Sequence, residues 1–237
     1  YAIMITNFGC GPDSFTIKYV SDIMGEKPWL LLEVDEHSSS VGMETRIEAF
    51  LDSLKDAPNI RATKSRQPFK PSNKIRRIFL PNFSDHGIAF AAAVRKLGFT
   101  PLLTSLPDDE SARLGSAHTT SGECHPFSLM LGDYIKVARS LNDTTDACYY
   151  MPEGGACRVG QFGTQIRLIA DGLGLKLPVF TRVSDLAPSI GKPSRSLYVS
   201  SMLTYWEMMR GMDFLMQRHF ETRAYEVVPG STDRARE

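Results

Sequence analysis

The sequence predicts an α/β fold: a doubly wound, mostly parallel sheet with helices on both faces and a long amphipathic helix near the carboxyl end. Short apolar runs alternate with longer segments in which apolar residues recur every three or four positions, which is typical of repeated β-α units. The chain has 237 residues, of which 42% are hydrophobic, enough to bury one large core or two small ones.

The apolar runs predict strands, and the amphipathic segments between them predict helices. Strands are expected near 1–8, 28–35, 75–81, 99–104, 146–151 and 177–182. Helices are expected at 12–24, 40–55, 85–97, 108–116, 125–141 and 158–173, followed by the long helix at about 195–223. Residues 229–237 are expected to be a frayed end.

The chain is expected to divide at a basic, proline-containing linker, residues 58–77. Before it, residues 1–57 form a β-α-β-α piece, and after it residues 75–191 form a Rossmann-like unit, with residues 192–237 as the final helix and tail. The sequence begins at Tyr1, inside an apolar strand and without a methionine, which suggests a fragment of something longer.

Charge, hydropathy and cysteine content argue against a nucleic-acid-binding, membrane-spanning or disulfide-dependent protein. The 27 lysines and arginines balance the 27 aspartates and glutamates, so no overall field favours nucleic acid. No window is apolar enough for a membrane span, and the amino terminus lacks the layout of a signal peptide, so a cytoplasmic location is expected. Four cysteines are too few for a disulfide-dependent fold of this size, which favours reduced thiols.

Three of the four cysteines directly precede a predicted helix, and glycines flank them. The local strings are Asn7-Phe-Gly-Cys-Gly-Pro-Asp-Ser14, Ser121-Gly-Glu-Cys-His-Pro126 and Glu153-Gly-Gly-Ala-Cys-Arg158. Loops at the carboxyl ends of parallel strands line one crevice, so Cys10, Cys124 and Cys157 are expected to converge there. The positive end of a helix favours a thiolate.

These thiols suit a metal, and the residues alone leave its identity open. Three thiolates can hold a [4Fe–4S] cluster with one iron open, and glycines at positions 9, 11, 122 and 155 would let the backbone approach it. Zinc with a fourth ligand from His125 or His37 is the alternative. Cys148 lies inside an apolar strand and is expected to be a buried core residue.

The same segments, in order, resemble a known family. They are Asn7 to Ser14, Lys27-Pro with Glu33-Val-Asp-Glu-His-Ser38, Thr45-Arg-Ile-Glu-Ala-Phe-Leu51, Ser121 to Pro126 and Met151-Pro-Glu-Gly-Gly-Ala-Cys-Arg-Val-Gly-Gln161. They resemble the carboxyl-terminal part of the large acyl-CoA dehydratase activases, which are related to 2-hydroxyacyl-CoA dehydratase and benzoyl-CoA reductase subunits and to double-cubane cluster proteins. The resemblance covers about residues 1–57 and 75–185.

The resemblance implies an iron–sulfur protein that works with an ATP-dependent electron donor and whose low-potential electrons serve reduction or dehydration of coenzyme A thioesters. It implies that Cys10, Cys124 and Cys157 hold one [4Fe–4S] cluster, in an enzyme of the dehydratase or activase kind or in a component that only relays electrons. Because no phosphate-binding loop of the Walker type is present, ATP is expected on a separate domain or partner. The double-cubane proteins use more cysteines than this chain has.

Residues beside the cysteines are candidates for supporting roles. Glu36 and His37 follow a strand, and a carboxylate beside an imidazole could move protons near an open iron, although the same segment could simply begin a helix. Glu123, His125 and Arg158 adjoin the cysteines and are expected around the cluster, where a cation would stabilise its reduced form.

Two further segments have candidate binding roles. The basic linker could bind the phosphates of coenzyme A or an acidic electron-donor protein, or it could simply be a solvated linker. The last helix carries apolar residues at three- and four-residue spacing, which pack on the chain's own core or on a second copy, as in a homodimer. The rival to a redox role is a non-catalytic, zinc-stabilised interaction module.

Overall fold

The computed structural model describes residues 1–7, 11, 13–55, 75–82, 84–120, 122–155, 157–190 and 194–236, and it confirms the predicted fold class. The strands are β1 (Ala2–Thr6), β2 (Trp29–Glu33), β3 (Arg77–Leu80), β4 (Thr100–Leu103), β5 (Ala147–Tyr150) and β6 (Val179–Phe180). The helices are α1 (Asp13–Met24), α2 (Ser40–Lys55), α3 (His86–Lys96), α4 (Asp109–Ser116), α5 (His125–Ser140), α6 (Val159–Gly172), α7 (Val183–Ile190), α8 (Arg195–Arg223) and α9 (Ser231–Arg236).

The six strands form two parallel sheets. One sheet pairs β1 with β2, and the other has the order β4-β3-β5-β6. In the larger sheet the chain runs from β3 outward to β4 and then returns to the other side of β3 as β5. The loops after β3 and β5 therefore leave in opposite directions, which makes the carboxyl end between them the topological switch point of the sheet.

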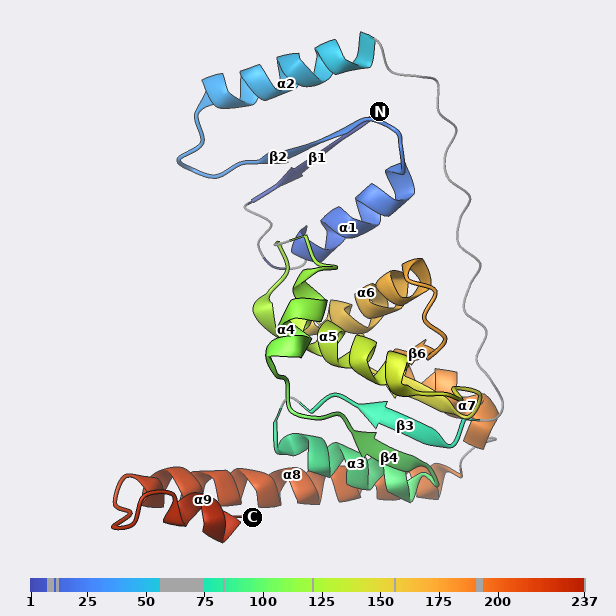
Figure 1. The fold of residues 1–237 in the computed structure, drawn as a ribbon, viewed down its shortest axis with the longest axis vertical. Helices are drawn as coiled ribbons and strands as arrows, with labels where there is room; N and C mark the ends of the chain where they lie inside the picture. Colours follow the sequence, from blue (N-terminus) through green and yellow to red (C-terminus); the bar gives the residue numbers. More distant parts are fainter. Residues whose placement is uncertain are drawn as a thin grey trace.

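Helices cover both faces of the larger sheet, and the alternation of side chains along β5 divides the core in two. Ala147, Tyr149 and Met151 pack with residues of α5 and α6, whereas Cys148 and Tyr150 pack with residues of α3 and α7. This is the two-residue period of a strand that is buried on both faces. Figure 1 shows α5 and α6 on one side of β3 and β4, with α3 and α8 on the other.

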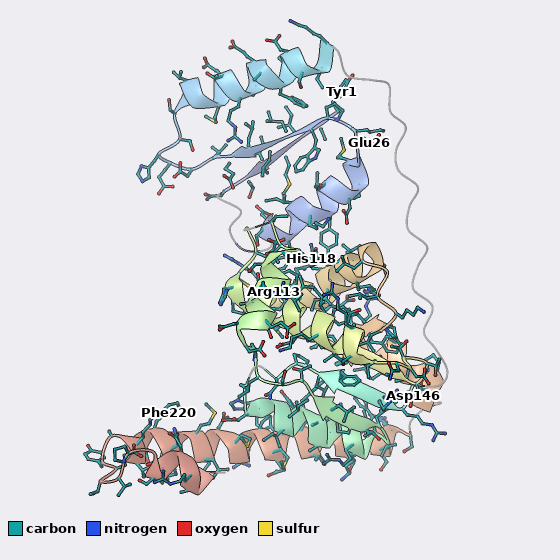
Figure 2. The ribbon with its side chains drawn as sticks, viewed as in Figure 1. Tyr1, Glu26, Arg113, His118, Asp146 and Phe220 are labelled. Carbon is teal, nitrogen blue, oxygen red and sulfur yellow. The ribbon has the colours of Figure 1, made fainter. Side chains whose placement is uncertain are left out.

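An ion pair joins the beginnings of β3 and β5. The Arg77 guanidinium donates to Asp146 Oδ1, with Nε at 2.9 Å and Nη2 at 2.5 Å. This hydrogen bond raises the pKa of Arg77 further above its ordinary value. Asp146 lies at the end of the sheet opposite the switch point (Figure 2). Residues 58–74 of the predicted linker lie outside the described residues, and Arg77, which was assigned to the linker, already belongs to β3.

Helices α4 and α5 approach each other through glycines. A Cβ atom on Gly115 would lie 1.7 Å from the carbonyl oxygen of Ser128, and one on Gly132 would lie 1.9 Å from that of Ser111. Since no side chain fits at those distances, the contact between the two helices requires glycine at both positions.

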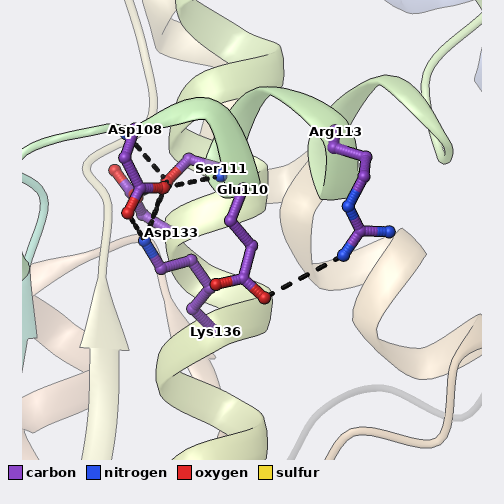
Figure 3. A network of polar contacts seen from close by, with 6 residues as sticks. All are labelled: Asp108, Glu110, Ser111, Arg113, Asp133 and Lys136. Carbon is purple, nitrogen blue, oxygen red and sulfur yellow. Dashed lines mark hydrogen bonds and ion pairs between the residues drawn. The ribbon is translucent and has the colours of Figure 1, made fainter.

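A polar network closes the same contact (Figure 3). Asp108 caps α4 by accepting from the Ser111 backbone N–H, and Lys136 of α5 donates to both Asp108 oxygens at 2.8 Å. The Lys136 hydrogen bond, with those of Ser111, lowers the pKa of Asp108 well below its ordinary value. The buried Ser111 hydroxyl donates to Asp133, whose pKa is raised by burial.

Helix α8 packs on α3 and extends beyond the sheet (Figure 1). Its buried Ser201 donates to the Ala93 carbonyl at 2.9 Å, and Tyr205 meets the edge of Phe90. Elsewhere around the helix, large apolar side chains are exposed, among them Leu203, Trp206, Phe214, Leu215 and Phe220. Phe220 lies on the part of α8 that projects past the sheet (Figure 2).

Two short helices were not predicted. Helix α7 follows β6 and contains Pro188, and α9 lies in the tail that was expected to be frayed. Helix α9 forms because Glu226 accepts from the Gly230 and Thr232 backbone N–H groups, and because His219 of α8 lies 3.4 Å from Asp233. None of the described helices has the length and apolar character needed to cross a membrane.

Candidate functional site

Three buried phenylalanines join the beginnings of three helices. Phe15 of α1 meets Phe127 of α5 edge-on, with ring centroids 5.1 Å apart, and lies 5.5 Å from Phe162 of α6. Phe127 and Phe162 are 5.1 Å apart, so the three rings form a closed cluster. Each side chain is at most 1% exposed. The Gln165 amide also donates to the Phe15 carbonyl at 2.6 Å.

This phenylalanine cluster places three helix amino termini near one another, because each ring belongs to the first turn or so of its helix. In the sequence, Cys10, Cys124 and Cys157 precede the three rings by five, three and five residues. The amino end of each helix carries about half a positive charge from its unpaired N–H groups. The cluster is therefore the feature of the fold that could bring the three thiols together.

Cys124 is the residue at the start of α5. Its backbone is extended (φ −71°, ψ 147°), and Pro126 follows in the first turn, where a missing N–H is harmless. The thiol is free and half-buried, and it packs against the core that contains the phenylalanine cluster.

Cys157 is exposed on the loop between β5 and α6, and glycines set the path of that loop. Gly154 and Gly155 have φ of 112° and 83°, a region that other residues rarely adopt. A Cβ on Gly160 would lie 2.1 Å from the Gly154 carbonyl oxygen. The first turn of α6 therefore rests directly on the loop backbone, and Cys157 is positioned by that contact.

Cys10 and Gly9 lie outside the described residues, so the predicted convergence of all three thiols stays a prediction. Next to them, Gly11 has φ of 62° and accepts a hydrogen bond from the Ser14 hydroxyl at 3.0 Å. In the part of the chain that the structure describes, no three side chains of histidine, cysteine, aspartate or glutamate form a group able to hold a metal.

Cys148 is a core residue, as predicted. Its side chain is fully buried on the β3–β5 pair, and burial raises the pKa of its thiol far above the ordinary value. A thiol that stays protonated is a poor ligand. Cys148 is thus the internal control for any experiment on the other cysteines.

The residues beside Cys124 and Cys157 have different surroundings. Glu123 is half-buried and accepts from the Thr120 backbone N–H and hydroxyl at 2.8 and 2.9 Å, so it fixes the loop before α5. His125 and Gly122 are exposed, and Arg158 is half-buried at the start of α6. The roles predicted for these residues around the cluster stay predictions.

Glu36 and His37 lie in the turn between β2 and α2. Their side chains are 3.7 Å apart and mostly exposed, and Asp35 organises the turn by accepting from the His37 backbone N–H and the Ser38 hydroxyl. Figure 1 shows this turn well away from the beginnings of α1, α5 and α6. The geometry favours the interpretation of a helix-start turn over a proton-transfer pair beside the cysteines.

An ion-pair cluster behind the Cys157 loop was not foreseen. Glu153 is bound by the Arg182 guanidinium and by the Thr164 hydroxyl at 2.9 Å, and Arg167 lies 3.9 Å away. Burial alone would raise the pKa of Glu153, but the hydrogen bonds from Thr181, Arg182 and Thr164 together lower it. Glu153 directly precedes the paired glycines and follows a buried strand. Because an acid in such a place needs a cation, the sequence motif could have predicted an ion pair here.

Comparison with protein-family models, with curated proteins and with solved structures gave no significant match.

Proposed function

We propose that this chain is an iron–sulfur redox component in which Cys10, Cys124 and Cys157 hold one [4Fe–4S] cluster. The observation that carries the proposal is the phenylalanine cluster, which joins the beginnings of α1, α5 and α6. Each of these helices follows one of the three cysteines in the sequence.

The surroundings of the thiols support an anionic group at this place. Three helix amino termini supply partial positive charge, which stabilises a cluster made of thiolates and sulfides. Cys124 packs on apolar core, and Cys157 lies at the surface. A group held between them would be shielded on one side and open to an electron donor on the other.

When bound, such a cluster supplies one-electron transfer at low potential and leaves one iron open to a further ligand. The residues of this chain would hold the cluster and balance its charge. The three thiolates would bind it, the glycines at 11, 122 and 155 would let the backbone approach it, and Arg158 would offer a cation at the start of α6. In keeping with the family resemblance, we propose an ATP-dependent activator as donor and a coenzyme A thioester as the final acceptor.

The test is anaerobic reconstitution of the full chain with iron and sulfide. We expect iron and sulfide to bind in equal amounts and the protein to show a broad visible absorption that dithionite bleaches. Alanine at Cys10, Cys124 or Cys157 is expected to remove most of the iron, while Cys148→Ala retains it. Iron retention in all three variants, or loss in Cys148→Ala alone, would contradict the ligand assignment.

The same samples distinguish the redox proposal from the alternative, a zinc-stabilised interaction module. That alternative draws on the exposed His125 beside Cys124, which could serve as a fourth ligand. A colourless protein with one zinc per chain, whose zinc is lost in His125→Ala, would replace the redox proposal.

A further inference from the structure

A cavity of about 390 Å³ lies at the switch point of the larger sheet. Its lining follows the ends of β3 and β5 and is completed by helices α3, α6 and α8. The described lining residues are Leu80, Pro81, Ser84, His86, Gly87, Phe90, Tyr150, Met151, Pro152, Val159, Tyr205 and Met209. In open α/β sheets this is the place where ligands bind, and the volume is within the range of small-molecule sites.

The walls of this switch-point cavity are mainly apolar and aromatic. Phe90 stacks on Tyr150 with centroids 5.7 Å apart, and Tyr205 of α8 meets the edge of Phe90 at 6.0 Å. Burial raises the pKa of Tyr150 to about 12, so its hydroxyl is neutral. No lysine, arginine or carboxylate belongs to the described lining.

One chain of hydrogen bonds gives the cavity a polar end. His86 Nε2 lies 2.8 Å from Asp213 Oδ1 on α8, and His86 Nδ1 lies 3.4 Å from the Ser84 hydroxyl. Because the carboxylate can only accept, Nε2 carries the proton, and Nδ1 of a neutral ring accepts from Ser84. The Asp213 charge balances any positive charge on the ring, so a ligand meets hydrogen-bonding groups rather than a net charge.

We propose that the switch-point cavity binds one small, uncharged aromatic alcohol, whose hydroxyl donates to the Ser84 oxygen. Aromatic walls suit an aromatic body. A carboxylate is disfavoured since it would lose its hydration without meeting an unpaired cation. This proposal is independent of metal binding.

The test uses ligand-observed NMR titration of the full chain with benzyl alcohol, toluene and benzoate. We expect saturable binding of benzyl alcohol and binding of benzoate that is weaker by about tenfold or more. In Ser84→Ala the affinity for benzyl alcohol is expected to fall about fivefold relative to that for toluene, as for the loss of one hydrogen bond. An unchanged ratio, or tighter binding of benzoate, would overturn the proposed ligand class.

Matched variants locate the site. Met209→Trp fills the cavity from α8 and is expected to abolish binding, whereas Met208→Trp on the neighbouring, exposed position leaves it unchanged. If Met209→Trp fails to fold, Val159→Phe fills the cavity from α6 instead. Equal binding in the filled and control variants would refute the location. Phe83, next to Ser84, lies outside the described residues. A strong gain of toluene affinity in Phe83→Ala would show that the Phe83 ring, and not a ligand, occupies the cavity.

Discussion

Phe15→Ala is expected to loosen the attachment of α1 to the larger unit and to reduce metal binding with it. Phe15 is fully buried and contacts both other rings of the phenylalanine cluster. Removing a buried phenylalanine costs about 3–5 kcal/mol, because apolar surface is exposed and a cavity remains. Since each 1.4 kcal/mol is a factor of ten, the open state of this contact should become roughly one hundred to several thousand times more populated.

Hydrogen exchange measured by mass spectrometry reports this opening directly. In Phe15→Ala we expect faster exchange in α1 and at the beginnings of α5 and α6, while β3, β4 and α3 keep their protection. The iron bound after anaerobic reconstitution is expected to fall in parallel, although no cysteine has changed.

The control is Phe50→Ala, which removes a similarly buried ring from α2 of the same amino-terminal piece. Its faster exchange should be confined to that piece, without an effect on the starts of α5 and α6. If Phe15→Ala left exchange and iron content unchanged, or if both variants gave the same pattern, the phenylalanine cluster would not be what joins the three helices.

Three further predictions concern stability and assembly. Gly115→Ala is expected to lower the free energy of unfolding by about 3 kcal/mol or more, because the new methyl group clashes with the α5 backbone. Gly211→Ala, with open space around it, is expected to raise the free energy of unfolding by up to about 1 kcal/mol. Urea unfolding measures both changes, and equal effects of the two variants would contradict the close approach of α4 and α5. Because burial raises the pKa of Asp133, its ionised carboxylate opposes folding at neutral pH, and this penalty fades as the pH falls toward about 3.9, the pKa of aspartate in the unfolded chain. The stability gained in Asp133→Asn should therefore be larger at neutral than at acid pH. The reverse trend would refute the argument. A homodimer through the exposed face of α8 predicts twice the chain mass in light scattering and a single-chain mass for Trp206→Asp, so a monomeric parent protein would exclude it.

Local pattern was sufficient to predict the order of the main elements. Apolar runs gave all six strands, and three- and four-residue spacing gave α8 as Arg195–Arg223. Helices α7 and α9 were missed for different reasons. Pro188 disfavours a helix at α7, and α9 depends on the Glu226 cap and on contact with α8, neither of which periodicity reveals.

Contacts between segments far apart in the sequence were harder to predict. Cys148 could be assigned to the core because its neighbours form one apolar run. The meeting of Phe15 with Phe127 and Phe162, by contrast, joins residues more than one hundred positions apart, and no spacing rule encodes it. The switch-point cavity likewise depends on strand order, which decides that the loops after β3 and β5 border one space.

The β5–α6 connection links the two proposed sites. Gly160 and Gly163 pack against the carbonyl oxygens of Gly154 and Met151, so the turn is held by backbone contact and needs no burial of its side chains. An exposed thiol such as Cys157 can therefore keep a fixed position at the surface. Two residues later, Val159 lines the switch-point cavity, so the turn that we propose to bind the metal and one wall of the cavity belong to one continuous segment.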